Sequence, residues 1–148
     1  MVTGGHGTDV LAVLLNPKRV QSQGEEIANS ISHGVGLVGA LVGTPFLVMH
    51  AVRHGDAGFI VGTSVFSASM ILLYLASALY HAWPIGKAKR CFRIIEHCAI
   101  FILIAGTYTP LTLGILRGAF GGTLCEVTWG LAAAGVALKA FNKSPSQL

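Results

Sequence analysis

The chain has 148 residues, of which 53% are hydrophobic and only 11% are charged, whereas soluble domains carry about 25% charged residues. Its mean hydropathy is +0.67, and the charged residues lie between long apolar runs, which excludes a soluble globular protein and predicts a single membrane domain. The formal net charge of +4 does not predict a nucleic-acid partner, because no basic helix face with interleaved aromatic residues occurs. We expect membrane lipids as the surroundings and no nucleic acid.

The first 24 residues are polar and rich in glycine, apart from one short apolar run at Val10–Leu15. That run is too short to span a membrane, and its positive charges, Lys18 and Arg19, follow it instead of preceding it. The sequence therefore predicts a cytoplasmic N-terminal tail over 1–24 and no signal peptide.

Four later segments each contain about the 20 mostly apolar residues that a membrane-spanning helix needs. The short connections between them favour antiparallel neighbours. The expected fold class is an all-α membrane protein, a bundle of about four transmembrane helices. The expected spans are 32–52, 57–80, 94–116 and 120–140, within a membrane domain over 25–141 that a polar tail over 142–148 follows.

The distribution of lysine and arginine predicts the orientation, because cytoplasmic loops carry an excess of these residues. With the N-terminus inside, only Arg53 and Arg117 lie on the outer side. The inner side then holds Lys18, Arg19, Lys87, Lys89, Arg90, Arg93, Lys139 and Lys143. We expect a multi-pass plasma-membrane protein with its N-terminus in the cytoplasm.

Small residues in the first span suggest close helix packing. Gly39-x-x-x-Gly43 is a pattern that lets two helices approach closely. Packing within the chain is the preferred interpretation, and a homo-oligomer is left open.

The polar residues of the membrane domain gather at one end of the expected spans. Antiparallel spans bring the start of the first, the end of the second and the start of the third to one face, and polar groups near lipid are functional candidates by default. These candidates are Glu26, Asn29 and His33 of the first span, Ser77 and His81 of the second, and Glu96 and His97 of the third.

Each group has a simpler interpretation when it is taken alone. Ser77 and His81 share a helix face, but their spacing favours a histidine ring in water and a serine bonded to its own backbone. A helix N-terminus favours Glu96, which could also pair with Arg93. Together, imidazoles and carboxylates in a membrane cleft could bind zinc, although the residues alone do not identify a reaction.

Three long motifs carry a family resemblance. The segments 25–34 (EEIANSISHG), 69–81 (SMILLYLASALYH) and 96–110 (EHCAIFILIAGTYTP) resemble, in order, the first three spans of the bacterial haemolysin III family. Trp129 and Lys139 fit its fourth span. The resemblance covers roughly 24–141, and this family is related to the adiponectin and progestin receptors.

The resemblance implies a seven-span protein of the bacterial inner membrane, with one zinc near the cytoplasmic leaflet and hydrolysis of lipid amides or esters. It implies that His81 is a zinc ligand and that Ser77 and Glu96 are catalytic residues that position water. Glu96 stands where the family normally has aspartate.

The remaining zinc ligands of such proteins come from a His-x-x-x-His motif in the last span. This sequence has four spans, so the resemblance implies a truncated chain with an incomplete site, in which His33 or His97 would have to supply further ligands. Three alternatives stay open: a haemolytic, pore-forming protein, a non-enzymatic receptor-like protein of membrane homeostasis, and a non-functional remnant.

Overall fold

The computed structural model describes residues 21–141, all but a few of which are helical. The helices are α2 (Gln23–His54), α3 (Ala57–Ala82), α4 (Lys87–Pro110), the π-helical turn η1 (Leu111–Ile115) and α5 (Gly118–Phe141). Four helices are long and apolar enough to cross a membrane, with α4 and η1 forming one of them. The expected all-α membrane class is confirmed, while the expected tails over 1–24 and 142–148 lie almost entirely outside the described residues.

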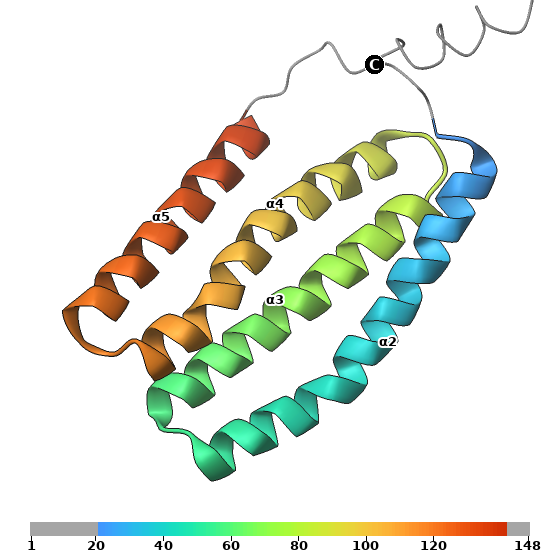
Figure 1. Ribbon diagram of the computed structural model, residues 1–148. Coiled ribbons are helices and arrows are strands. Elements are labelled where there is room, and N and C mark those ends of the chain that lie inside the picture. Colours follow the sequence, from blue (N-terminus) through green and yellow to red (C-terminus); the bar gives the residue numbers. More distant parts are fainter. Residues whose placement is uncertain (1–20, 142–148) are drawn as a thin grey trace, which may run out of the picture.

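The four helices lie side by side in chain order, as Figure 1 shows. α2 packs along α3, α3 along α4, and α4 along α5, while α2 and α5 occupy the two edges. Within residues 21–141, the backbones of α2 and α4 do not pack directly against each other. The arrangement is therefore an open row of helices, and α3 and α4 are its best-buried members.

Side-chain caps fix where the first two helices begin. Ser22 precedes α2, where its Oγ accepts a hydrogen bond from the Glu25 N–H at 3.3 Å and its own N–H donates to the Glu25 carboxylate at 2.7 Å. Asp56 precedes α3 and accepts from the Phe59 N–H at 3.0 Å. The other Asp56 oxygen pairs with Arg117 at 2.8 Å, which ties the start of α3 to the loop before α5. Such caps satisfy the N–H groups that have no partner within a helix.

Small side chains form the buried contacts between the helices. The buried residues include Ala76 and Ser69 of α3 and Ala105 and Gly106 of α4. A Cβ built on Gly39 or Gly43, by contrast, would have no neighbouring atom within 4 Å. The predicted Gly39-x-x-x-Gly43 contact is therefore not used for packing among the residues that the structure describes.

α3 and α4 approach each other closely at Gly62 and Pro110. A Cβ on Gly62 would overlap the Pro110 backbone and lie 2.9 Å from the carbonyl carbon of Thr109. Proline has no N–H to continue the helical hydrogen-bond ladder, and the chain changes to the π-helical turn Leu111–Ile115 directly after it. Gly62 thus makes room for an irregular backbone inside the membrane domain.

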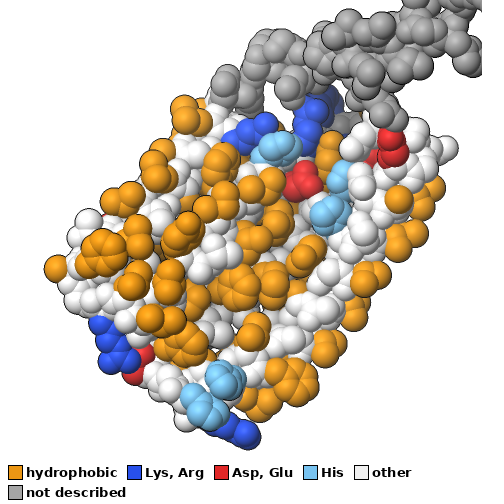
Figure 2. All heavy atoms as spheres, viewed as in Figure 1, with side chains coloured by type: hydrophobic (Ala, Val, Ile, Leu, Met, Phe, Trp, Pro, Cys, Tyr) orange, Lys and Arg blue, Asp and Glu red, His pale blue; other side chains and the backbone are white. Residues whose placement is uncertain are grey.

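Charged side chains gather at the two ends of the row and leave an apolar band between them (Figure 2). Glu126 is the exception: it is exposed on α5, in the ninth position of a 24-residue helix. No described residue forms a hydrogen bond or an ion pair with it.

Candidate functional site

Side chains from three helices meet at one end of the row. We call Glu26 of α2, Ser77 and His81 of α3, and Lys89 and Glu96 of α4 the polar cluster. Acidic, basic and histidine side chains adjoin one another there in Figure 2. The polar ends of the first three spans therefore lie together, as the sequence predicts, and their side chains are in contact.

Glu26 fixes the orientation of the His81 ring. The His81 side chain is only 8% exposed, and its Nδ1 lies 2.8 Å from Glu26 Oε2. A carboxylate oxygen accepts, so Nδ1 carries the proton in this contact and the Nε2 of a neutral ring keeps its lone pair. The preferred interpretation of a histidine ring in water was wrong, because the ring is buried between α2 and α4.

Ser77 and Glu96 form the second contact of the cluster. Ser77 is buried, and its hydroxyl donates to Glu96 Oε1 at 2.6 Å, a short distance typical of a hydrogen bond to an ionised carboxylate. Ser77 therefore does not bond to its own backbone, as the spacing alone had favoured. His81 Nε2 lies 3.9 Å from the same Glu96 oxygen, which is too far for a direct hydrogen bond.

Glu96 lies deeper in its helix than the sequence suggested. α4 begins at Lys87, which makes Glu96 its tenth residue, and the favourable effect of a helix N-terminus fades after the first turn. Arg93 is not among its ion-pair partners in the described part of the chain. The contacts with Ser77 and His81, rather than the helix end, therefore define the environment of Glu96.

Lys89 belongs to the cluster, although its place in the sequence predicts only a positive charge on the cytoplasmic side. Its Nζ lies 2.9 Å from Glu26 Oε1 and 4.9 Å from the centre of the Tyr80 ring. The side chain is 14% exposed, so its stem is buried against the cluster. No sequence motif marked Lys89, which lies in the first turn of α4, directly after the short α3–α4 connection.

The other predicted site residues divide into two groups. His33 lies directly beside the polar cluster, because its ring stacks on the His81 ring with 5.6 Å between the two ring centroids. The centroid of the Tyr74 ring lies 6.1 Å from that of His33. Asn29 instead lines a separate open hollow with Gln21, Glu25 and Ala28.

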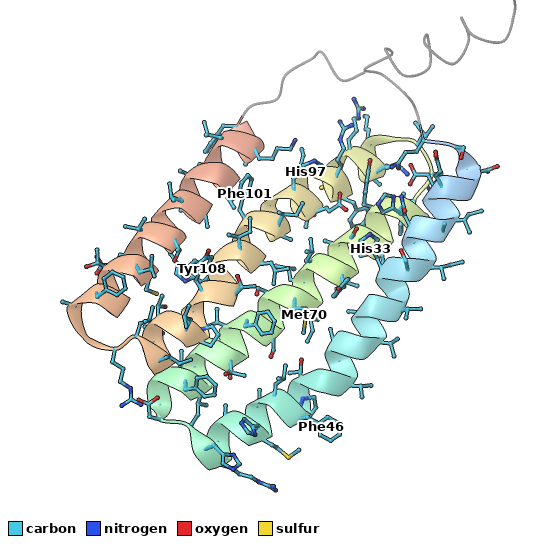
Figure 3. The ribbon with its side chains drawn as sticks, in the orientation of Figure 1. His33, Phe46, Met70, His97, Phe101 and Tyr108 are labelled. Carbon is cyan, nitrogen blue, oxygen red and sulfur yellow. The ribbon has the colours of Figure 1, made fainter. Side chains whose placement is uncertain are left out.

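His97 lies at the same end of the molecule as His33 (Figure 3), but its hydrogen bond is to its own helix and not to the polar cluster. Its Nδ1 donates to the Arg93 carbonyl at 2.6 Å, and its side chain is 40% exposed. The Nδ1 atom lies 3.9 Å from Glu96 Oε2. His97 therefore lies beside the cluster and not within it.

A pocket of about 370 Å³ extends from the cluster into the apolar band. Its polar end is formed by His33, Ser77 and Glu96, and Thr107 adds one hydroxyl farther along. The remaining lining is apolar and comes from Phe66, Met70, Leu73, Tyr74, Ile100 and Leu103. The pocket thus joins the polar side chains of the cluster to an apolar slot.

The cluster matches a zinc site in chemistry but not in ligand number. A metal-bound histidine usually donates its other ring N–H to a carboxylate, and Glu26 holds His81 in this way. A catalytic zinc has three protein ligands, however, and residues 21–141 contain no group of three histidine, cysteine, aspartate or glutamate side chains placed to hold a metal ion. The described residues therefore hold one histidine in the orientation of a metal ligand and do not form a complete zinc site.

Comparison with known proteins agrees with the motifs. The family model described as "Haemolysin-III related" matches residues 21–147. "Hemolysin-3 homolog" of Bacillus subtilis (strain 168) is 46% identical over 117 residues, which is 79% of this chain and 55% of the relative. "Hemolysin-3" of Bacillus cereus is 45% identical over 117 residues, which is 79% of this chain and 53% of the relative.

The chain spans about half the length of these curated relatives. No solved structure gives a significant match. The extent of the family match and the order of its motifs establish that this membrane protein belongs to the haemolysin-III related family.

Proposed function

We propose that the polar cluster is one part of a zinc-dependent hydrolase site that acts on lipid amides or esters within the membrane. The observation that carries the proposal is the contact of Ser77 with Glu96 at the polar end of an apolar pocket, next to a His81 ring that Glu26 orients. Zinc, when bound, supplies a Lewis acid that polarises a carbonyl and a nucleophile at neutral pH.

His81 is the proposed zinc ligand, through Nε2. Glu26 holds the proton on Nδ1 and so keeps the Nε2 lone pair directed into the cluster. Because the described residues supply only this one well-oriented ligand, further ligands have to come from outside them or from a rearrangement of His33.

Glu96 is the proposed proton acceptor. Its Oε1 already accepts from Ser77, while Oε2 accepts no hydrogen bond from residues 21–141 and lies 3.9 Å from His97 Nδ1, so it can accept one from a water molecule. Ser77 fixes the carboxylate in this position. Positioned general bases contribute roughly 10²–10⁴-fold to a rate, and Glu96 has the chemistry for this role.

A long-chain lipid suits the pocket better than a small polar substrate does. The lining is mostly apolar, with its polar groups concentrated at the cluster end, so a hydrocarbon chain can lie along it with the amide or ester group beside Glu96. Such a substrate would enter from the bilayer. The basic residues Lys87, Arg90 and Arg93 lie near the same end, which supports a cytoplasmic location for the cluster.

Hydrolysis by the 148-residue chain in zinc-supplemented phosphatidylcholine vesicles tests this function. The substrates are a long-chain N-acyl amide and a long-chain ester, each with a fluorescent acyl chain. Because the described residues supply only one well-oriented ligand, we expect slow release of the labelled fatty acid. We also expect a loss of about 100-fold or more in Glu96→Gln and unchanged activity in Glu126→Gln. Equal rates for the wild-type chain and Glu96→Gln on both substrates would reject the proposal.

The names of the relatives suggest membrane lysis as a second candidate function. A wide pore needs a polar lining, whereas charged side chains of the described helices lie mostly at the two ends of the row. The same vesicles, loaded with a self-quenched dye, distinguish the two functions. We expect fatty-acid release without dye release, and the reverse result would favour lysis.

A further inference from the structure

The end of α2 opposite the polar cluster carries two histidines that the proposed function does not use. His50 lies 24 residues after Glu26 on one continuous helix, a distance of roughly 36 Å at 1.5 Å per residue. The imidazoles of His50 and His54 adjoin each other, and Figure 2 shows histidine side chains at both ends of the row of helices. Any ligand that they bind is therefore distinct from a ligand of the cluster.

The two rings are positioned as a pair. They are four residues apart, so they project from the same face of α2, and their centroids are 4.5 Å apart with 25° between the ring planes. Both residues are exposed at the helix end. An ion in the surrounding water can therefore reach both rings without a rearrangement of the helices.

A backbone contact fixes which nitrogen of His54 is available. His54 Nδ1 lies 3.2 Å from the His50 carbonyl oxygen, and because a carbonyl only accepts, Nδ1 is the donor. Nε2 of the neutral ring therefore keeps its lone pair, in the arrangement by which backbone carbonyls orient metal-binding histidines. The His50 ring has no hydrogen-bond or ion-pair partner within residues 21–141, so its nitrogens are not engaged.

We propose that His50 and His54 form a two-histidine site for a first-row divalent transition-metal ion, with Cu²⁺ bound most tightly. Imidazole suits this class of ion, and affinity for a given nitrogen site is greatest for Cu²⁺. The nearest acidic residue in sequence, Asp56, is engaged with Phe59 and Arg117. Water therefore completes the coordination.

Titration of the 148-residue chain in detergent micelles with Cu²⁺ tests the site, with electron paramagnetic resonance as the readout. We expect one bound Cu²⁺ whose spectrum shows two coordinated nitrogens and whose affinity falls at least tenfold in His50→Gln and in His54→Gln. His81→Gln, which removes the proposed ligand of the cluster, should leave this Cu²⁺ signal unchanged. This control separates the two sites, so that failure of one proposal does not imply failure of the other.

Both histidines are exposed, so their replacement should leave the helix content unchanged by circular dichroism. Identical Cu²⁺ affinity and spectra in the wild-type chain and either single variant would overturn the proposal. A signal that is lost in His81→Gln instead would also overturn it, because the ion would then belong to the cluster.

Discussion

Gly62→Ala should destabilise the protein strongly, although it adds only one methyl group. The new Cβ would overlap the Pro110 backbone and lie 2.9 Å from the Thr109 carbonyl carbon, so α3 and α4 would have to separate. Overpacking of this kind typically costs about 1–3 kcal/mol and occasionally more. Reversible unfolding in mixed micelles, followed by circular dichroism, measures the change in the free energy of unfolding.

Two other glycines provide matched controls for this effect. Gly39→Ala meets no atom within 4 Å and should be neutral or slightly stabilising, because alanine favours helix more than glycine does. Gly106→Ala would meet the Ser69 hydroxyl, which can rotate away, and should have an intermediate effect. Equal stability of the Gly62→Ala and Gly39→Ala variants would contradict the described packing of α3 on α4.

Glu26→Gln should reduce both the stability and the hydrolytic activity. An amide cannot replace a carboxylate that pairs with Lys89 Nζ at 2.9 Å and accepts from His81 Nδ1 at 2.8 Å. Leaving a buried donor without its partner costs about 1–3 kcal/mol, and the partial exposure of Glu26 places the cost near the lower end. Loss of a residue that orients a metal-bound histidine typically costs about 10–100-fold in metal affinity or activity.

The neighbouring residue supplies the control for Glu26. Glu25 closes the cap at Ser22, and glutamine can fill the same position of a capping box. Glu25→Gln removes the same charge one residue away but leaves the contact of Glu26 with His81 in place. It should therefore leave hydrolysis nearly unchanged. Equal losses in both variants would assign the effect to net charge at the start of α2 and not to the contact with His81.

Much of this architecture could be predicted from the sequence, because the hydrophobic effect acts on long stretches. Four apolar runs separated by short polar connections predict four antiparallel helices, and antiparallel helices bring Glu26, His81 and Glu96 to one end. The packing details could not be predicted in the same way. Gly62 and Gly39 look equivalent in the sequence, and only the helix rotation shows that Gly62 meets Pro110.

The individual contacts of the cluster also depend on rotation and helix length. Ser77 and His81 gave no sign of their partners, because those partners lie 19 and 55 residues away along the chain. Lys89 lies before the expected third span over 94–116, because the start of α4 at Lys87 is not marked by a side-chain cap. The family motifs assigned roles to Ser77, His81 and Glu96. Glu26 was a candidate from its place at the start of the first span, whereas Lys89 became one only through its distances to Glu26 and Tyr80.

The proposed function depends most directly on the orientation of the His81 ring, since a zinc ligand needs a free Nε2 lone pair. Long-range ¹H–¹⁵N correlation spectra of the histidine side chains in the 148-residue chain report which ring nitrogen carries the proton, and His81→Gln identifies the resonance. We predict that the proton of the neutral His81 ring lies on Nδ1, and that this tautomer population changes in Glu26→Gln. A His81 ring with its proton on Nε2, unaffected by Glu26→Gln, would contradict the account.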